Sequence, residues 1–269
     1  MRTLKRRSAG VMITLKKEKE LLLMRKAGRI VADVLDALAE IIRPGVSTAE
    51  IDRAAEEIIA KGGATPAFKG YRVPGIPIAF PGTVCASINE EVVHGIPDPA
   101  RILEEGDIIS IDVGACYSGY YGDAACTYPA GKVSEARRRL MDATRESLEK
   151  AIGAARAGNT LGDIGHAVES YVTSRGFGLV RDYAGHGIGA HLHEPPQVPN
   201  YGRKGRGITL KSGMTLAIEP MVMSGAEEVE VGADRWVVKT ADGSDAAHFE
   251  KTVLIRDGQP EILTPWTWA

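Results

Sequence analysis

Two apolar segments, each carrying a single acid, constrain this chain more than any other feature. Residues 108–114 (IISIDVG) and 122–128 (GDAACTY) are rich in apolar and β-branched side chains, which predicts two buried strands. A hairpin centred near residues 117–118 would place Asp112 and Asp123 directly opposite each other, with Cβ atoms roughly 4.5–5.5 Å apart. Carboxylates this close in apolar surroundings are unfavourable unless a proton or cation lies between them. The pattern indicates either a divalent metal site or two solvated acids on an exposed hairpin face.

The composition limits the class of protein. With 269 residues, 44% of them hydrophobic and 25% charged, the chain can form one large globular domain or two small ones. A net charge of −2 gives the body no reason to bind DNA or a membrane. The three cysteines, Cys85, Cys116 and Cys126, form no C-x-x-C pair, which argues against a disulfide framework and indicates a reducing compartment. Because there is no secretory signal and no apolar run of about 20 residues, we expect a cytoplasmic protein.

The start of the chain is strongly basic. Six of the first 17 residues are Lys or Arg, and residues 1–16 are predicted to form a flexible arm. Such an arm is either a solvated tail or a contact for an anionic surface such as ribosomal RNA.

Two similar helix pairs are expected. Apolar residues recur with a helical period over residues 17–42 and again over about 134–155. Each of these helices is followed by an R-x-G-x-[ST] turn and a capping box, formed by Ser47 with Glu50 and by Thr160 with Asp163. Strands are expected after each pair, at residues 83–89, 108–128, 214–223, 236–240 and 247–255. The repeat is short enough to arise by chance, but it predicts an α+β fold with one pseudo-symmetric domain over residues 17–269.

Further metal-ligating candidates lie in the second half. His186 stands between glycines, which leave room for a ligand to approach closely, and the glycines also allow His193 to turn back toward the same cavity. Glu219 lies in an apolar run before a proline, where an unpaired carboxylate would be costly to bury. Glu250 is either a further ligand or a surface acid paired with Lys251. Two acids from each half and one histidine would suffice for two divalent ions.

The combined pattern resembles a known family. The residues Asp112, Asp123, His186, Glu219 and Glu250, in this order and context, resemble the metal-ligand set of the pita-bread aminopeptidases of peptidase family M24. Residues 89–97 (NEEVVHGIP) are similar to those of type I methionine aminopeptidases in particular, and the likeness extends over residues 17–262. The resemblance implies that Asp112 binds one divalent ion, that His186 and Glu219 bind a second, and that Asp123 and Glu250 bridge them. Cobalt, manganese, iron and zinc all suit such ligands.

The resemblance also implies roles around the metals. His94 is expected near the scissile amide, His193 on the carbonyl oxygen, and Glu219 is the candidate to relay a proton to the leaving amine. The pocket for the methionine side chain is expected to consist of Phe80, Cys85, Leu192 and Trp236. The chain departs from the family pattern by a short insertion, residues 73–79, in the loop that leads to this pocket.

The implied activity is the metal-dependent removal of the initiator methionine from nascent proteins and peptides, with a preference for a small second residue. The enzyme is expected to be a monomer whose partners are nascent polypeptide N-termini. One alternative is an Xaa-Pro aminopeptidase or prolidase, which uses the same five ligands but usually carries an extra N-terminal domain. The other is a non-catalytic pita-bread binding module, although such modules generally lose ligands.

Overall fold

Four helices form as two pairs, as predicted. The computed structural model describes residues 13–268, and its helices are α1 (Glu18–Ile41), α2 (Thr48–Lys61), α3 (Glu135–Ala154) and α4 (Leu161–Thr173). Both predicted capping boxes are present, at the starts of α2 and α4. In each, the carboxylate accepts the backbone N–H of the hydroxyl-bearing residue, which satisfies a donor that the helix leaves unpaired.

Short strands fill the space between the helix pairs. They are β1 (Thr65–Pro66), β2 (Val84–Ile88), β3 (Glu91–Val93), β4 (Ile108–Tyr117), β5 (Tyr120–Pro129), β6 (Gly178–Leu179), β7 (Gly185–Gly187), β8 (Glu194–Val198), β9 (Thr215–Ile218), β10 (Met221–Met223), β11 (Val229–Val231), β12 (Val238–Thr240), β13 (Ala246–His248), β14 (Lys251–Leu254) and β15 (Glu261–Ile262). Each predicted strand region contains at least one of them. Most strands that were not predicted, such as β1, β6 and β7, have two or three residues and too little sequence for a periodic signal. The exception is β8, which has five residues but contains two prolines, which argue against a strand.

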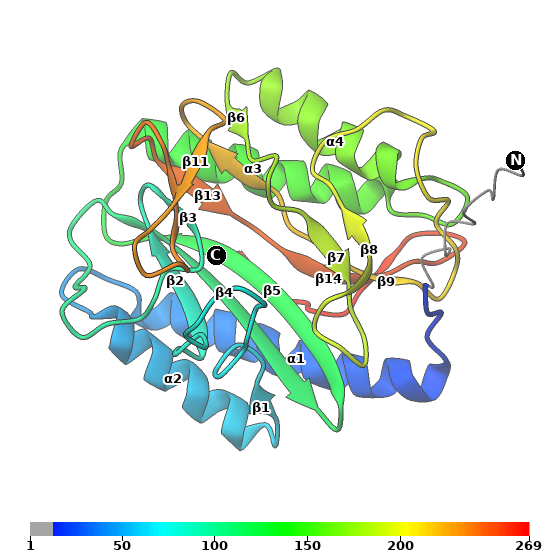
Figure 1. The fold of residues 1–269 in the computed structure, drawn as a ribbon, viewed down its shortest axis with the longest axis horizontal. Coiled ribbons are helices and arrows are strands. Elements are labelled where there is room, and N and C mark those ends of the chain that lie inside the picture. Colours follow the sequence, from blue (N-terminus) through cyan, green and yellow to red (C-terminus); the bar gives the residue numbers. More distant parts are fainter. Residues whose placement is uncertain (1–12, 269) are drawn as a thin grey trace, which may run out of the picture.

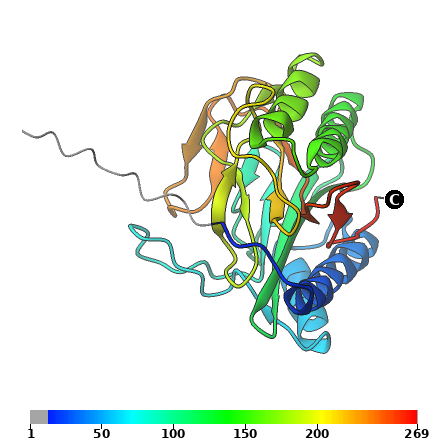
Figure 2. The ribbon, with the colours of Figure 1, turned by 90° about the vertical axis from the view of Figure 1, so that its right-hand side faces the viewer.

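The strands form four small sheets with the helices on one side. The order is β1-β4-β2 with β5 on β4, then β13-β10-β6, β11-β12-β3 and β15-β14-β9-β7-β8. In Figure 1 the pair α1 and α2 lies below the strands and the pair α3 and α4 lies above them, and Figure 2 shows both pairs toward the same side of the strands. The main apolar core lies between helices and strands, where α1 packs on β4 and β5, and α3 on β10 and β13. Among the described residues, no helix is long and apolar enough to cross a membrane.

The central hairpin differs from its predicted register. Tyr117 pairs with Tyr120, so the turn is Ser118–Gly119, and both residues have positive φ, at 49° and 82°. Such a two-residue turn matches the twist of the flanking strands. Asp112 consequently faces Ala125, and Asp123 faces Gly114, so the prediction that the two acids are direct partners is wrong. They are diagonal neighbours on one face of the sheet, which still brings long side chains within reach of each other.

The described part of the predicted arm belongs to the folded body. Residues 1–12 lie outside the described residues, but residues 13–16 run along the surface in a defined path. Ile13 packs on the main core, and the backbone N–H of Lys16 donates to the carbonyl of Gly213 at 2.8 Å. The Lys16 ammonium pairs with Glu194 at 2.6 Å, with both side chains buried. Residues 13–16 therefore contact the folded body, while the rest of the predicted arm lies outside the described residues.

Candidate metal centre

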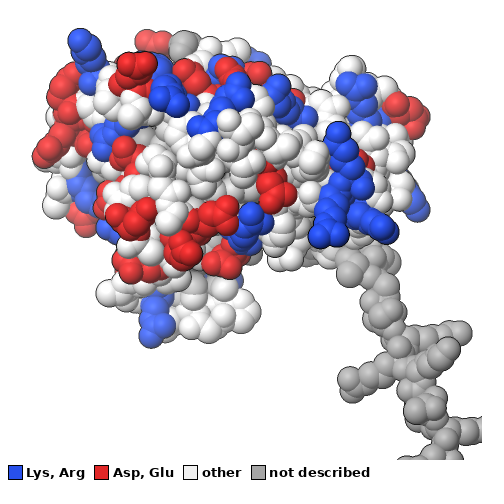
Figure 3. Space-filling view, turned by 90° about the horizontal axis from the view of Figure 1, so that it is seen from above, with Lys and Arg blue, Asp and Glu red and all other residues white. Residues whose placement is uncertain are grey.

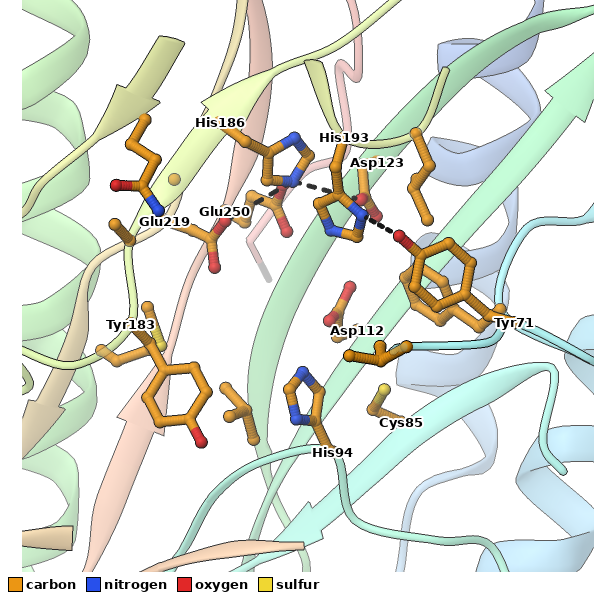
Figure 4. A pocket seen from close by; sticks show the side chains of 18 of the residues that line it. Tyr71, Cys85, His94, Asp112, Asp123, Tyr183, His186, His193, Glu219 and Glu250 are labelled. Atoms are coloured by element: carbon orange, nitrogen blue, oxygen red, sulfur yellow. Dashed lines mark hydrogen bonds and ion pairs between the residues drawn. The ribbon is translucent and has the colours of Figure 1, made fainter. Parts of the chain in front are cut away.

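One cavity collects every residue predicted for the site. Its volume is about 970 Å³, and Figure 4 shows its walls, with acids and histidines from both halves of the chain pointing inward. The predicted residues that line it are Phe80, Cys85, His94, Asp112, Asp123, His186, Leu192, His193, Glu219, Trp236 and Glu250.

Two threonines join the halves of the molecule and set two of these acids side by side. The hydroxyl of Thr252 donates to the carbonyl of Asp123 at 2.8 Å and accepts the N–H of the same residue at 3.2 Å. Two residues before Thr252, the N–H of Glu250 donates to the carbonyl of Ala125 at 2.9 Å. Thr127 bridges in the same way to both backbone groups of His248. Asp123 on β5 and Glu250 before β14 therefore become neighbours through backbone contacts.

Glu219 and Glu250 occupy matching breaks between strands. Strand β9 pairs with β14, and β10 pairs with β13, but the two ladders belong to different sheets. Pro220 lies at the crossing point and has no N–H to continue a ladder. Its carbonyl accepts from Phe249 at 3.3 Å, so the two breaks face each other. Glu219 therefore lies between β9 and β10, and Glu250 lies between β13 and β14, outside the regular strands. Glu250 is only 2% exposed and Lys251 instead donates to the carbonyl of Trp266, so the alternative of a surface ion pair is wrong.

The glycines around His186 are required by close backbone packing. A Cβ at Gly185 would lie 2.3 Å from the carbonyl oxygen of Ala217, and one at Gly187 would lie 2.3 Å from that of Pro195. His186 is held on β7, with its Nδ1 2.9 Å from the carbonyl oxygen of Gly187. Because a carbonyl only accepts, Nδ1 carries the proton and Nε2 keeps a lone pair.

The free nitrogen of His186 faces carboxylates. Its Nε2 lies 3.8 Å from an oxygen of Asp123 and 3.6 Å from an oxygen of Glu219. Burial lowers the pKa of His186 to about 3, so the ring is neutral at physiological pH. A neutral nitrogen lone pair beside carboxylate oxygens is a repulsive arrangement unless a cation lies between them. Ligand atoms of Asp123, His186 and Glu250 all lie within 4.8 Å of one another, which is close enough for one ion.

The four acids also have shifted pKa values. Burial raises the pKa of Asp112 to about 7. It also raises the pKa of Asp123, Glu219 and Glu250 well above the usual range, and the neighbouring carboxylates raise these values further. Buried oxygens of Asp112, Asp123 and Glu250 have no hydrogen-bond partner among residues 13–268. Unpartnered hard oxygen donors together with one imidazole fit divalent ions, so the residues present suit a metal centre. The alternative of an exposed hairpin face is wrong, since Asp123 is 3% exposed.

The four residues predicted for the methionine pocket form one end of the cavity. Phe80, Cys85, Leu192 and Trp236 belong to a single buried apolar cluster. The rings of Phe80 and Trp236 meet edge to face, with centroids 5.3 Å apart, a favourable arrangement for aromatic pairs. The indole N–H of Trp236 donates to the carbonyl of Ile78 at 3.0 Å, so the insertion at residues 73–79 helps to fix this wall.

His94 and His193 reach the cavity from opposite walls, as Figure 4 shows. His94 follows β3 and has a φ of 62°, a left-handed conformation that non-glycine residues seldom adopt and that often marks functional positions. Burial lowers the pKa of His94 to about 4, which keeps the ring neutral. His193 lies close to His186, with ring centroids 4.4 Å apart, so the chain between them does turn back on itself as expected.

Some residues at the site were missed. Tyr71 bonds to His193, Phe68 and Tyr183 line the cavity, and His248 places Nε2 3.7 Å from Glu219. Of these, only His248 had a usable signal, because residues two apart in a strand share a face and His248 precedes Glu250 by two. The others lie in loops, where spacing carries no such information.

Comparisons with known proteins agree with this geometry. A sequence profile of metallopeptidase family M24 matches residues 22–257. A methionine aminopeptidase of Clostridium acetobutylicum is 52% identical over 94% of this chain and 99% of its own. The crystal structure of a methionine aminopeptidase from Thermotoga maritima superimposes with a TM-score of 0.90 at 48% identity, covering 94% of this chain and 99% of that one. This match confirms the pita-bread α+β fold expected from the sequence.

A prolidase from Pyrococcus furiosus is a more distant neighbour. It has a TM-score of 0.74 at 24% identity and covers 94% of this chain but 66% of its own. That likeness shows a shared fold and nothing about activity.

Proposed function

The chain belongs to metallopeptidase family M24, and we infer that within this family it is a methionine aminopeptidase, which removes the N-terminal methionine from proteins and peptides. The observation that carries this inference is the convergence of four carboxyls, two buried and two half-buried, and one neutral imidazole beside an apolar pocket. The relatives that match over nearly the whole chain support the methionine specificity.

The division of ligands follows the family resemblance. Asp112 would hold one divalent ion, His186 and Glu219 the other, and Asp123 and Glu250 would bridge the two. When bound, such ions lower the pKa of a shared water to near neutrality and polarise the substrate carbonyl. Membership of the family implies the use of divalent metal. We propose two ions per chain, which would be cobalt, manganese, iron or zinc.

The chain's own residues supply the remaining chemistry. Glu219 lines the cavity with one oxygen 3.6 Å from Nε2 of His186, and it would take up a proton and pass it to the leaving amine. His193 would donate to the carbonyl oxygen as negative charge develops there, a contribution worth about 3 kcal/mol for a single donor. His94, on the opposite wall, would contact the scissile amide.

Substrate selection would come from the apolar end. Phe80, Cys85, Leu192 and Trp236 enclose a space lined by carbon and sulfur, which suits an unbranched thioether side chain. We expect a small second residue, as in the family that the sequence resembles. The distant prolidase likeness gives no comparable support for the Xaa-Pro alternative.

The setting of the enzyme is also part of the proposal. We expect a single catalytic domain over residues 17–269 that acts as a monomer. We also expect it in the cytoplasm, a reducing compartment that suits its three free cysteines. The basic residues near the N-terminus are the candidate for ribosome contact, and most of them fall in residues 1–12, outside the described part of the chain.

A comparison of two peptides tests this function. With added Co²⁺ or Mn²⁺, the protein should release methionine from Met-Ala-Ser and leave Ala-Pro-Ala intact, and a chelator should stop the reaction. Cleavage of the proline peptide instead would favour the prolidase alternative. Metal binding without cleavage of either peptide would favour a non-catalytic module.

A further inference from the structure

The loop before the insertion places a tyrosine against His193. The Tyr71 hydroxyl lies 2.7 Å from Nδ1 of His193, and the two rings meet edge to face with centroids 5.4 Å apart, as Figure 4 shows. We propose that Tyr71 is a positioning residue that fixes the orientation and the tautomer of His193, so that the Nε2–H of His193 is directed at the substrate carbonyl. This inference rests on the proposed function and deepens it.

The backbone holds Tyr71 firmly in this place. Its N–H donates to the carbonyl of Phe68 at 2.8 Å, and its carbonyl accepts from Phe80 at 2.9 Å. The N–H of Gly70 donates to the carbonyl of Phe80 at 2.8 Å. These bonds join the two ends of the loop at residues 72–79. The position of Tyr71 is therefore fixed at the base of the loop, before the insertion begins. The tyrosine ring also packs on the apolar cluster that forms the pocket.

The partners of the tyrosine hydroxyl select the direction of the hydrogen bond. If the tyrosine O–H donates to Nδ1, the proton of the neutral imidazole resides on Nε2. If Nδ1–H donates instead, the tyrosine O–H needs a different acceptor, and His193 is its one hydrogen-bond partner among residues 13–268. The first arrangement is therefore favoured, and it leaves His193 with a donor on the cavity side, where its other nitrogen points in Figure 4.

A fixed donor matters because an imidazole without a partner on Nδ1 can rotate and can carry its proton on either nitrogen. Histidines with chemical roles are usually held by a second group on the other nitrogen, and loss of such a group typically lowers activity 10- to 100-fold. A donor that strengthens only as charge develops affects kcat more than KM.

The kinetic test replaces only the hydroxyl. Tyr71→Phe keeps the ring and its packing, and we expect kcat on Met-Ala-Ser to fall about tenfold with little change in KM. The matched control is Tyr120→Phe, which removes a hydroxyl bonded to Glu20 at 2.8 Å outside the cavity and should retain the kcat of the unaltered enzyme. An unchanged kcat in Tyr71→Phe would overturn the proposal.

A second measurement observes the tautomer directly. Nitrogen-15 NMR of the histidine side chains, in the Zn²⁺-loaded protein at pH 8, should show His193 with a protonated Nε2 and an unprotonated Nδ1. The signals are assigned by their loss in His193→Gln. A protonated Nδ1 in the unaltered protein would overturn the proposal. Because this experiment needs no turnover, its failure is distinguishable from a failure of the proposed function.

Discussion

Glu219 is both a candidate metal ligand and the candidate for proton transfer. It follows β9 directly, precedes a proline, and places one oxygen 3.6 Å from His186 and the other 3.7 Å from His248. Desolvation raises its pKa well above the usual range. A carboxyl in a cleft whose pKa is shifted this strongly is a candidate for a catalytic role.

Replacement of this carboxylate should separate activity from folding. We expect Glu219→Gln to lower kcat on Met-Ala-Ser by about 10³-fold, because an amide cannot accept and pass on a proton, while the similar shape leaves the fold unchanged. Activity is measured on metal-replete protein whose circular dichroism matches that of the unaltered chain. Near-normal turnover in that preparation would rule out the proton-transfer role.

At the residue scale, the sequence predicts acids well and loop aromatics poorly. Asp112 and Glu219 are recognisable because a carboxylate within an apolar run is costly to bury unless it has a partner such as a metal ion. Glu250 was ambiguous beside Lys251, and its burial depends on how β5 and β14 meet. The sequence did not predict the contact between Tyr71 and His193, because the two residues are 122 positions apart in the chain.

At the scale of elements, the residues of the turn determine the strand register, which the periodicity of the sequence does not predict. The two apolar segments predicted the β4–β5 hairpin, but its register depends on which two residues adopt positive φ. The structure places Ser118 and Gly119 there, which shifts the pairing by two positions and keeps Asp112 and Asp123 on one face. The helix starts, in contrast, were predictable because capping boxes are local.

Lys16, in the N-terminal segment, binds the loop that carries His193. Lys16 Nζ pairs with Glu194 at 2.6 Å, and a second Glu194 oxygen accepts the N–H of His191 at 3.0 Å. A Cβ at Gly189 would lie 2.1 Å from the Lys16 side chain, so a glycine is needed there for the lysine to enter. The basic composition of this region concealed the role of Lys16.

Loss of this lysine should destabilise the protein. Lys16→Met leaves the Glu194 carboxylate buried without its cation, and we expect the free energy of unfolding to fall by about 3 kcal/mol. The control Lys17→Met alters an exposed side chain and should change stability little. Urea unfolding of both variants gives the comparison. Equal stability of the two would show that the Lys16–Glu194 pair is dispensable.

At the scale of the whole molecule, the site exists only where the two halves meet. The first half supplies Asp112 and Asp123, and the second supplies His186, Glu219 and Glu250. Threonine bridges from β5 to β13 and β14 hold the halves in register. The duplicated helix pairs pack behind the strands and leave the opposite side to the cavity loops. The repeat was visible in the sequence, but the contact between halves was not, because it involves residues more than a hundred positions apart.

Surface charge is mixed over the face seen in Figure 3, where acidic and basic side chains are interspersed over much of the body and several basic ones gather toward its right-hand side. No single sign of charge dominates that face.

The most direct test of this account is a count of bound metal. Calorimetric titration of the metal-free protein with Mn²⁺ at pH 7.5 should give two ions per chain. It should also release protons, because groups with raised pKa values hold protons that the ions displace, and binding should weaken as the pH falls toward 6. The double variant Asp123→Asn, Glu250→Gln should lose this binding. One ion or none in the unaltered protein, or full binding in the double variant, would contradict a two-metal centre built from these residues.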